Sequence, residues 1–118
     1  FIALHDALQR VVDRGDLAAN PLHSFCTAIS VGIVDGVPLL DLPYVEDSAA
    51  EVDMNVVMLR PIDGGEARFV EVQGTAEGMA FTRPELDSLL RLAEGGLATI
   101  ADLQAELLAT PPAARPAG

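Results

Sequence analysis

"SVGIVDGVPLLDLPYVEDSAAEVDMNVVM", residues 30–58, decides the fold of this chain because it holds one complete hairpin signal and the start of a second. It continues a run of β-branched and small apolar residues, 25–34, which predicts a buried strand. Asp35 and Gly36 then form a two-residue turn signal that is typical of a tight hairpin. The segment 37–42 is therefore predicted to return as the second strand.

A second hairpin is predicted after the acidic part of this stretch. Residues 54–60 and 68–74 have the composition of strands, and the turn "PIDGGEA" separates them. Apolar and polar residues are mixed in 68–74, which indicates a sheet with a partly exposed surface. Together the four strands predict a single sheet made of two hairpins.

A helix is predicted on either side of the strands. Helical spacing of apolar residues predicts the first over 1–14 and the second over 83–109, where Thr82 and Glu85 form a capping box. The apolar stripe of the second helix consists of Leu86, Leu89, Leu90, Ala93, Leu97, Ile100, Leu103 and Leu107. The members expected to be buried are Leu86, Leu90, Leu97 and Ile100, and at least one further apolar patch is expected to stay open. The predicted fold class is α+β, in two layers: a mixed or antiparallel sheet of two hairpins with both helices packed on it.

Composition limits the classes of protein to which this chain can belong. Its 118 residues, half of them apolar, suffice for one domain with a core, and no apolar run is long enough to cross a bilayer. The only cysteine, Cys26, lies in an apolar run and is expected to be a buried, inert thiol; a reducing, cytoplasmic location is expected. The net charge of −11, with seven arginines and no lysine, argues by itself against binding a polyanion.

Negative charge is concentrated in one segment, 41–53. Five of its thirteen residues are acidic and none is basic, which favours either a solvated loop or a cation site. Asp47 and Asp53 would lie about 20 Å apart on an extended chain and on opposite faces of a helix. Both can reach one ion only if the segment turns back on itself, and two carboxylates with several waters and substrate phosphates suit Mg²⁺.

Other residues that could take part in catalysis or ligand binding lack the sequence neighbours that such sites need. His5 and His23 have no neighbouring ligands that would suggest a zinc site, and Glu77 is expected to be a loop residue and not a ligand. None of the serines considered lies in a nucleophile motif; they are Ser24, Ser30 and Ser48. Gly74 and Gly78 bracket a turn without the remainder of a phosphate-binding loop.

Longer motifs carry more information than these single residues. "DLPYVEDSAAEVDMN" (41–55) and "VEVQGTAEG" (70–78) resemble the C-terminal half of the bacterial ribonuclease PH family, whose fold is of the ribosomal protein S5 domain 2-like type. The resemblance covers almost the whole chain except the tail and a longer turn, "LRPIDGGEAR". It implies that residues 1–109 form the C-terminal half of a ribonuclease PH-type domain and that 110–118 are a flexible tail.

The resemblance also implies a function. The family consists of phosphate-dependent 3′→5′ exoribonucleases (tRNA nucleotidyltransferases) that trim tRNA precursor 3′ ends, with inorganic phosphate as co-substrate and nucleoside 5′-diphosphates as products. Asp47 and Asp53 are implied as the catalytic residues and as the ligands of Mg²⁺. Asn55 agrees with ribonuclease PH, because the related second core of polynucleotide phosphorylase has lysine at that position.

Several parts of such an enzyme are expected to lie outside this sequence. The family binds phosphate through an upstream Gly-Thr-Arg element, takes much of its basic RNA-facing surface from an N-terminal half, and assembles as a homo-hexamer, a trimer of dimers. Phe1 starts a helix without a capping residue, so we expect a longer protein. Because the resemblance places these parts elsewhere, the isolated fragment is expected to be inactive. The alternatives are an acidic interaction module, a phosphodiesterase that uses water, and a non-catalytic structural subunit of an exosome-like ring.

Overall fold

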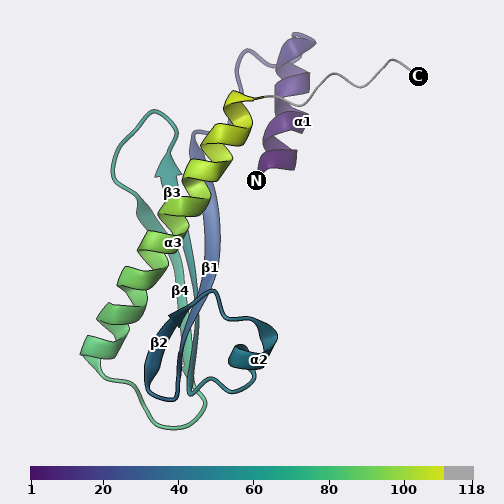
Figure 1. Cartoon of the computed structure of the whole chain (residues 1–118). Helices are drawn as coiled ribbons and strands as arrows, with labels where there is room; N and C mark the ends of the chain where they lie inside the picture. The colour runs from purple at the N-terminus through teal and green to yellow at the C-terminus, as the bar shows by residue number, and fades with distance from the viewer. Residues whose placement is uncertain (111–118) are drawn as a thin grey trace.

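The computed structural model describes residues 1–110 as one antiparallel sheet with a long helix across it (Figure 1). The elements in chain order are α1 (Ile2–Asp13), β1 (Ser24–Val34), β2 (Val37–Leu40), α2 (Tyr44–Asp47), β3 (Val52–Pro61), β4 (Arg68–Ala76) and α3 (Arg83–Ala109). The strand order is β2-β1-β3-β4, and every neighbouring pair is antiparallel. The predicted α+β class is confirmed. Of the predicted tail 110–118, all but Thr110 lies outside the described residues.

Both predicted hairpins are present, and each has a local reason for its geometry. Asp35 and Gly36 have φ angles of 49° and 72°, the left-handed values that a tight two-residue turn between twisted strands requires. In the second hairpin the register shifts between Val57 and Met58, so that Val70 is an extra residue on β4. Strand boundaries differ from the prediction by up to two residues: β2 ends at Leu40 and not at 42, β3 begins at Val52 and not at 54, and β4 ends at Ala76 and not at 74.

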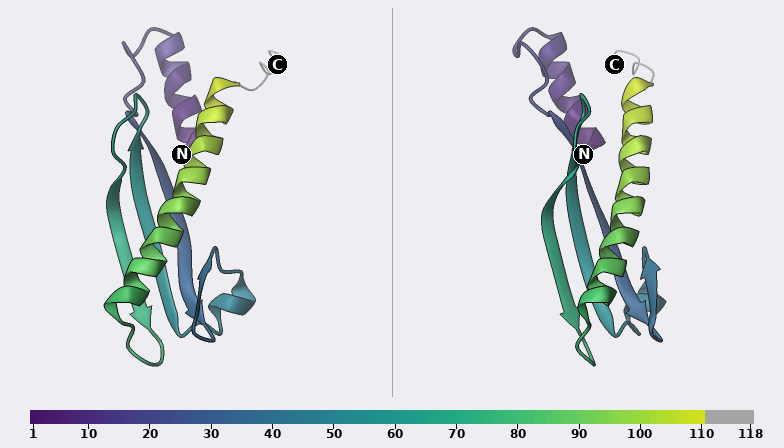
Figure 2. Two further views of the ribbon diagram at one scale, coloured as in Figure 1. Left: turned by 60° about the vertical axis from the view of Figure 1, so that its left-hand side comes forward. Right: turned by 90° about the vertical axis from the view of Figure 1, so that its left-hand side faces the viewer.

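The core lies between α3 and one face of the sheet (Figure 2). The helix packs on β1, β2 and β3. Of the four residues expected to be buried, only Leu97 is buried, and Leu86, Leu90 and Ile100 are half-buried. The residues of α3 that are buried are Leu89, Ala93, Gly96, Leu97 and Ala101. The contact line, along which α3 touches the sheet, therefore runs mainly through every fourth residue of the helix. The leucines on either side of this line remain partly exposed to solvent.

Gly96 shows why the contact line passes where it does. A Cβ atom at this position would lie 2.8 Å from Ile29 Cδ1 and 2.9 Å from Leu40 Cδ1. The helix backbone therefore approaches the sheet closely here, which a larger side chain would prevent. At the start of the helix the predicted capping box is confirmed: Glu85 Oε2 accepts the Thr82 N–H at 2.6 Å, and Thr82 Oγ1 accepts the Glu85 N–H at 3.4 Å.

The first helix does not cover the sheet, which corrects the prediction that both helices pack on it. α1 has no buried residue and lies beyond the end of the sheet, beside the last part of α3 (Figures 1 and 2). Its main anchor is the Phe1 ring, 5.6 Å from the Phe25 ring. Cys26 is exposed and not buried, because it points to the face of the sheet opposite α3.

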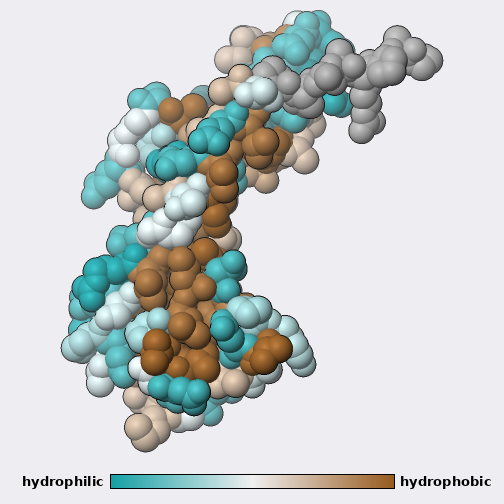
Figure 3. Space-filling model, in the orientation of Figure 1, coloured by the Kyte–Doolittle hydropathy of each residue, from teal (hydrophilic) through white to brown (hydrophobic). Residues whose placement is uncertain are grey.

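Apolar surface remains open, as expected. The exposed members on β4 and on the last part of α3 are Phe69, Val70, Val72, Leu103 and Leu107. Hydrophobic side chains also form a continuous band along α3 in the space-filling view (Figure 3). No helix within residues 1–110 is sufficiently long and apolar to span a membrane.

Candidate functional site

The acidic segment leaves the sheet, makes one helical turn and returns. After β2 the chain turns at Asp41, whose φ is 58°. Its N–H donates to Ser30 O at 2.9 Å, and the Leu42 N–H donates to Ser30 Oγ at 3.3 Å. Pro43 then precedes the four-residue helix α2, which ends at Asp47. These bonds fix the point at which the segment departs from β1.

The return is fixed by further backbone bonds. The N–H of Ala50 donates to Asp47 O at 3.2 Å, and the N–H of Glu51 donates to Ile33 O at 2.8 Å. The chain then enters β3 at Val52. The prediction that the segment turns back on itself is confirmed, and small residues make up the turn between α2 and β3.

Asp53 lies on the face of the sheet opposite α3, level with Gly32 of β1 and Thr75 of β4. A Cβ atom at Gly32 would lie 2.8 Å from Leu42 Cδ2 and 2.5 Å from Val52 O. Leu42 can therefore pack over this strand only because residue 32 has no side chain. The acidic segment thus lies against the same face as Asp53 and half-buries it.

The carboxyl group of Asp53 is electrostatically coupled to two other carboxylates. Burial raises its pKa above the ordinary value, and the negative charges of Asp47 and Glu77 raise it further, while the Met54 backbone N–H opposes them. Asp47 and Asp53 are six residues apart in sequence, but the turn brings their charges within interaction range. Of the acids in the segment, Asp41, Glu46 and Glu51 make no such contribution to Asp53.

Glu77 is a loop residue, as predicted, but its place near Asp53 was not predicted. It follows β4 directly, and its N–H donates to Glu51 O at 2.9 Å. The pairing of Val52 with Ala76 explains this, because an antiparallel register places the next residue, 77, beside 51. The predicted hairpin contained this signal: once 54–60 is paired with 68–74, the end of β4 must lie beside the end of the acidic segment.

No cluster of three or more His, Cys, Asp or Glu side chains within residues 1–110 is arranged to hold a metal ion. The donor set consists of the Asp47 and Asp53 carboxylates, with Glu77 as a further charge nearby. No arginine or histidine in this part of the chain forms an ion pair with any of the three. Two uncompensated carboxylates fit a hard cation that keeps several water ligands, as Mg²⁺ does.

The histidines and serines have structural surroundings. His5 Nδ1 is buried beside Asp6 on α1, and His23 precedes β1. The Ser30 hydroxyl accepts the Leu42 N–H, and the Ser48 hydroxyl donates to Val45 O at 3.1 Å. These contacts shape the acidic segment and provide no nucleophile.

The domain match agrees with this geometry. The model of the 3′ exoribonuclease family, domain 2, matches residues 24–96, which is more than half of the chain. The matched region begins with β1, ends within α3, and contains Asp47, Asp53 and Glu77. The resemblance to the C-terminal half of ribonuclease PH is confirmed at this level. The chain therefore belongs to the 3′ exoribonuclease family, whose second domain it carries.

Proposed function

We propose that this domain supplies the metal-binding part of the active site of a phosphate-dependent 3′→5′ exoribonuclease that trims the 3′ ends of tRNA precursors. The observation that carries the proposal is the convergence of the Asp47 and Asp53 charges, with no ion-pair partner for either within residues 1–110. Backbone hydrogen bonds hold the segment between Asp47 and Asp53, so the convergence does not depend on side-chain contacts.

The charge of the site suits magnesium. Like charges close together destabilise one another, so a bound divalent cation relieves a repulsion that the fold imposes on Asp47, Asp53 and Glu77. The two aspartates would be the direct ligands, and Glu77 would add negative potential. When bound, Mg²⁺ would screen the incoming anion from the RNA phosphodiester and stabilise charge on the leaving 3′ oxygen.

Attack by inorganic phosphate suits the same charge arrangement. Phosphorolysis brings one anion against another, and a nucleoside 5′-diphosphate is released when phosphate attacks the terminal phosphodiester. The reverse reaction adds a nucleotide to a 3′ end. The aspartates do not bind phosphate themselves, because they are anionic; their part is to place the cation beside the reacting groups.

Cationic groups must come from elsewhere in the enzyme. The net charge of −11 repels RNA, so a basic surface and a phosphate-binding element are required to complete the site. In the proposed enzyme these belong to an N-terminal half of the ribonuclease PH type, within a hexamer that is a trimer of dimers. The open apolar surface of β4 and α3 is compatible with such neighbours.

Product analysis tests the proposal. The enzyme that contains this domain is incubated with a short RNA ending in a free 3′ hydroxyl, with and without inorganic phosphate and Mg²⁺. We expect nucleoside diphosphates, formed only when both are present. Nucleoside monophosphates formed without phosphate would instead indicate attack by water, and no release under any condition would favour a structural subunit.

A further inference from the structure

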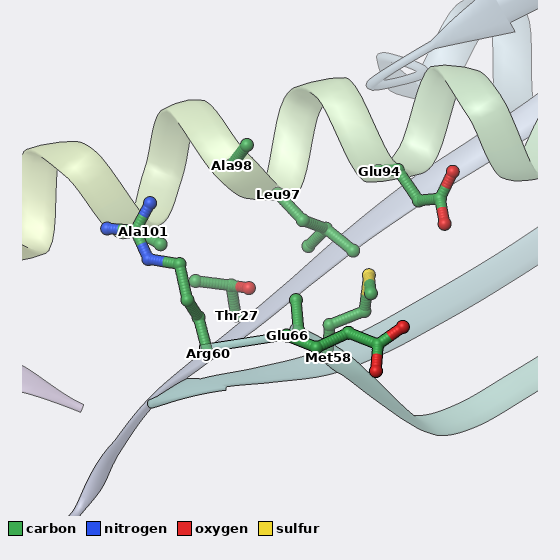
Figure 4. A pocket seen from close by; sticks show the side chains of 9 residues that line it. Thr27, Met58, Arg60, Glu66, Glu94, Leu97, Ala98 and Ala101 are labelled. Atoms are coloured by element: carbon green, nitrogen blue, oxygen red, sulfur yellow. The ribbon is translucent and has the colours of Figure 1, made fainter. Parts of the chain in front are cut away.

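A cavity lies between α3 and the β3–β4 hairpin, near the end of β3 remote from Asp53 (Figure 4). Its volume is about 250 Å³. The residues that line it are Thr27, Met58, Arg60, Glu66, Ala67, Glu94, Leu97, Ala98 and Ala101. None of them belongs to the acidic segment, so the cavity has no part in the proposed metal site.

Thr27 is the polar group in the interior of this cavity. Only 5% of the residue is exposed, and its side chain lines the cavity. In Figure 4 the oxygen points into the space between Leu97 and Met58, while the methyl group points toward Ala101. A hydroxyl group that faces a cavity can donate and accept hydrogen bonds, so this site is suited to a ligand with a neutral hydrogen-bonding group.

The positive charge in the cavity wall is already compensated. Arg60 Nη1 donates to Asp102 Oδ1 at 2.6 Å, and the guanidinium carbon lies 5.3 Å from the centre of the Phe25 ring. Arg60 is therefore held by a carboxylate and an aromatic ring. It is poorly placed to attract an anionic ligand, because Asp102 opposes any second negative charge.

Negative charge at the other end of the cavity is not compensated in this way. Glu94 projects from α3 and Glu66 from the loop before β4, and both carboxylates point to the same end (Figure 4). Neither forms an ion pair within the described part of the chain. Between this end and Thr27 the wall is apolar and consists of Met58, Leu97 and Ala98.

We propose that this cavity binds a small aliphatic amine that carries a neutral hydroxyl group, an amino alcohol. The ammonium group lies between the carboxylates of Glu66 and Glu94, the carbon chain contacts Met58 and Leu97, and the hydroxyl group bonds to Thr27. A cavity of about 150 Å³ can hold benzene, so this one accommodates roughly six to ten non-hydrogen atoms. The inference stands apart from the proposed exoribonuclease function and uses none of its residues.

Three probes of similar size test the assignment. We would titrate 4-amino-1-butanol, pentylamine and pentanoate into the ¹⁵N-labelled protein and follow the amide resonances of Thr27, Met58 and Leu97. The expected result is saturable binding of the amino alcohol with a dissociation constant of about 1 mM, weaker binding of pentylamine, and none of pentanoate. Pentanoate binding as tightly as the amines, or no saturable binding of 4-amino-1-butanol, would overturn the proposal.

Variants assign the two ends of the ligand. E66Q and E94Q are each expected to weaken both amines about threefold, and E106Q, on an exposed position of the same helix, to weaken neither. Thr27→Val should weaken 4-amino-1-butanol about fivefold and leave pentylamine unchanged. Thermal unfolding checks that Thr27→Val is folded. The assignment would be contradicted if the folded Thr27→Val variant bound 4-amino-1-butanol as tightly as the native protein. It would also be contradicted if neither E66Q nor E94Q weakened the binding of the two amines.

Discussion

The two faces of β3 differ in composition although they alternate along one strand. Toward α3 the strand presents Val52, Met54, Val56 and Met58, all buried, and toward the opposite face Asp53, Asn55, Val57 and Leu59, all at least partly exposed. The buried face is uniformly apolar and holds the helix. The other face carries the carboxylate to which the acidic segment returns.

This difference shows how the strand can carry a charged group with little loss of folding stability. Because side chains alternate, each buried neighbour of Asp53 fixes its backbone without surrounding its carboxylate by apolar atoms. The carboxylate therefore stays partly exposed to solvent and interacts electrostatically with Asp47. Substitutions on the polar face should therefore change mainly chemistry, and substitutions on the apolar face mainly stability.

The largest effect is expected on activity from the polar face. In the enzyme that contains this domain, Asp53→Asn and Asp47→Asn should each lower RNA phosphorolysis by about 10²–10³-fold, because the proposed cation loses an anionic ligand. Each should also weaken the binding of Mn²⁺, a paramagnetic probe for the same site, to the isolated protein. Asp63→Asn, in the β3–β4 loop, is the matched control. Normal turnover and normal Mn²⁺ binding in both aspartate variants would disprove the metal site.

The next effect is expected on stability from the apolar face. Met54 is 1% exposed and packs over Gly74, where a Cβ atom would lie 2.9 Å from its Cε atom. Met54→Ala should lower the free energy of unfolding by about 3 kcal/mol, because it leaves a cavity under α3. Leu59→Ala, at a 37% exposed position on the same strand, should lower it by about 0.5 kcal/mol. Urea denaturation measures both, and equal losses would show that the two faces are not distinct.

The hairpins could be predicted because their signals are local. Asp35 and Gly36 accept the left-handed conformation of a tight turn, and Thr82 and Glu85 satisfy each other across one helical turn. The helix contact line could not be predicted as easily. Periodicity indicated an apolar stripe on α3, but which part of the stripe is buried depends on the close approach at Gly96, a tertiary contact with β1 and β2.

The candidate site was predictable only in part for the same reason. The spacing of Asp47 and Asp53 required a turn, and the small residues between them allowed it. Glu77 lies in a different segment, and its position follows from strand register across the bulge-containing hairpin. Cys26 was wrongly predicted to be buried, because an apolar run does not reveal that only one face of the strand is covered.

A smaller effect on stability is expected at the capping box, which starts α3, the helix that covers the apolar face of the sheet. Thr82→Ala removes the side chain that accepts the Glu85 N–H, and should lower the free energy of unfolding by about 1 kcal/mol. Thr82→Ser retains the hydroxyl group and serves as the control. Urea denaturation of the two variants would refute the role of the cap if both lost the same stability.

The smallest effect is a pH dependence that reports on Asp53 itself. Its pKa is raised in the folded state by burial and by the Asp47 and Glu77 carboxylates, so the folded protein binds a proton there more strongly than the unfolded chain. Its contribution to stability therefore falls as the pH rises from the ordinary value of 3.8 through the raised pKa.

Asp53→Asn removes this penalty. In the absence of divalent metal, the variant should unfold at a slightly higher temperature than the native protein at pH 7, and the difference should disappear below the ordinary pKa. Saturating Mg²⁺ should reverse the order at pH 7, because only the native protein keeps both proposed ligands. A variant that is less stable than the native protein without metal would show that the Asp53 carboxylate is stabilised by a contact other than a cation.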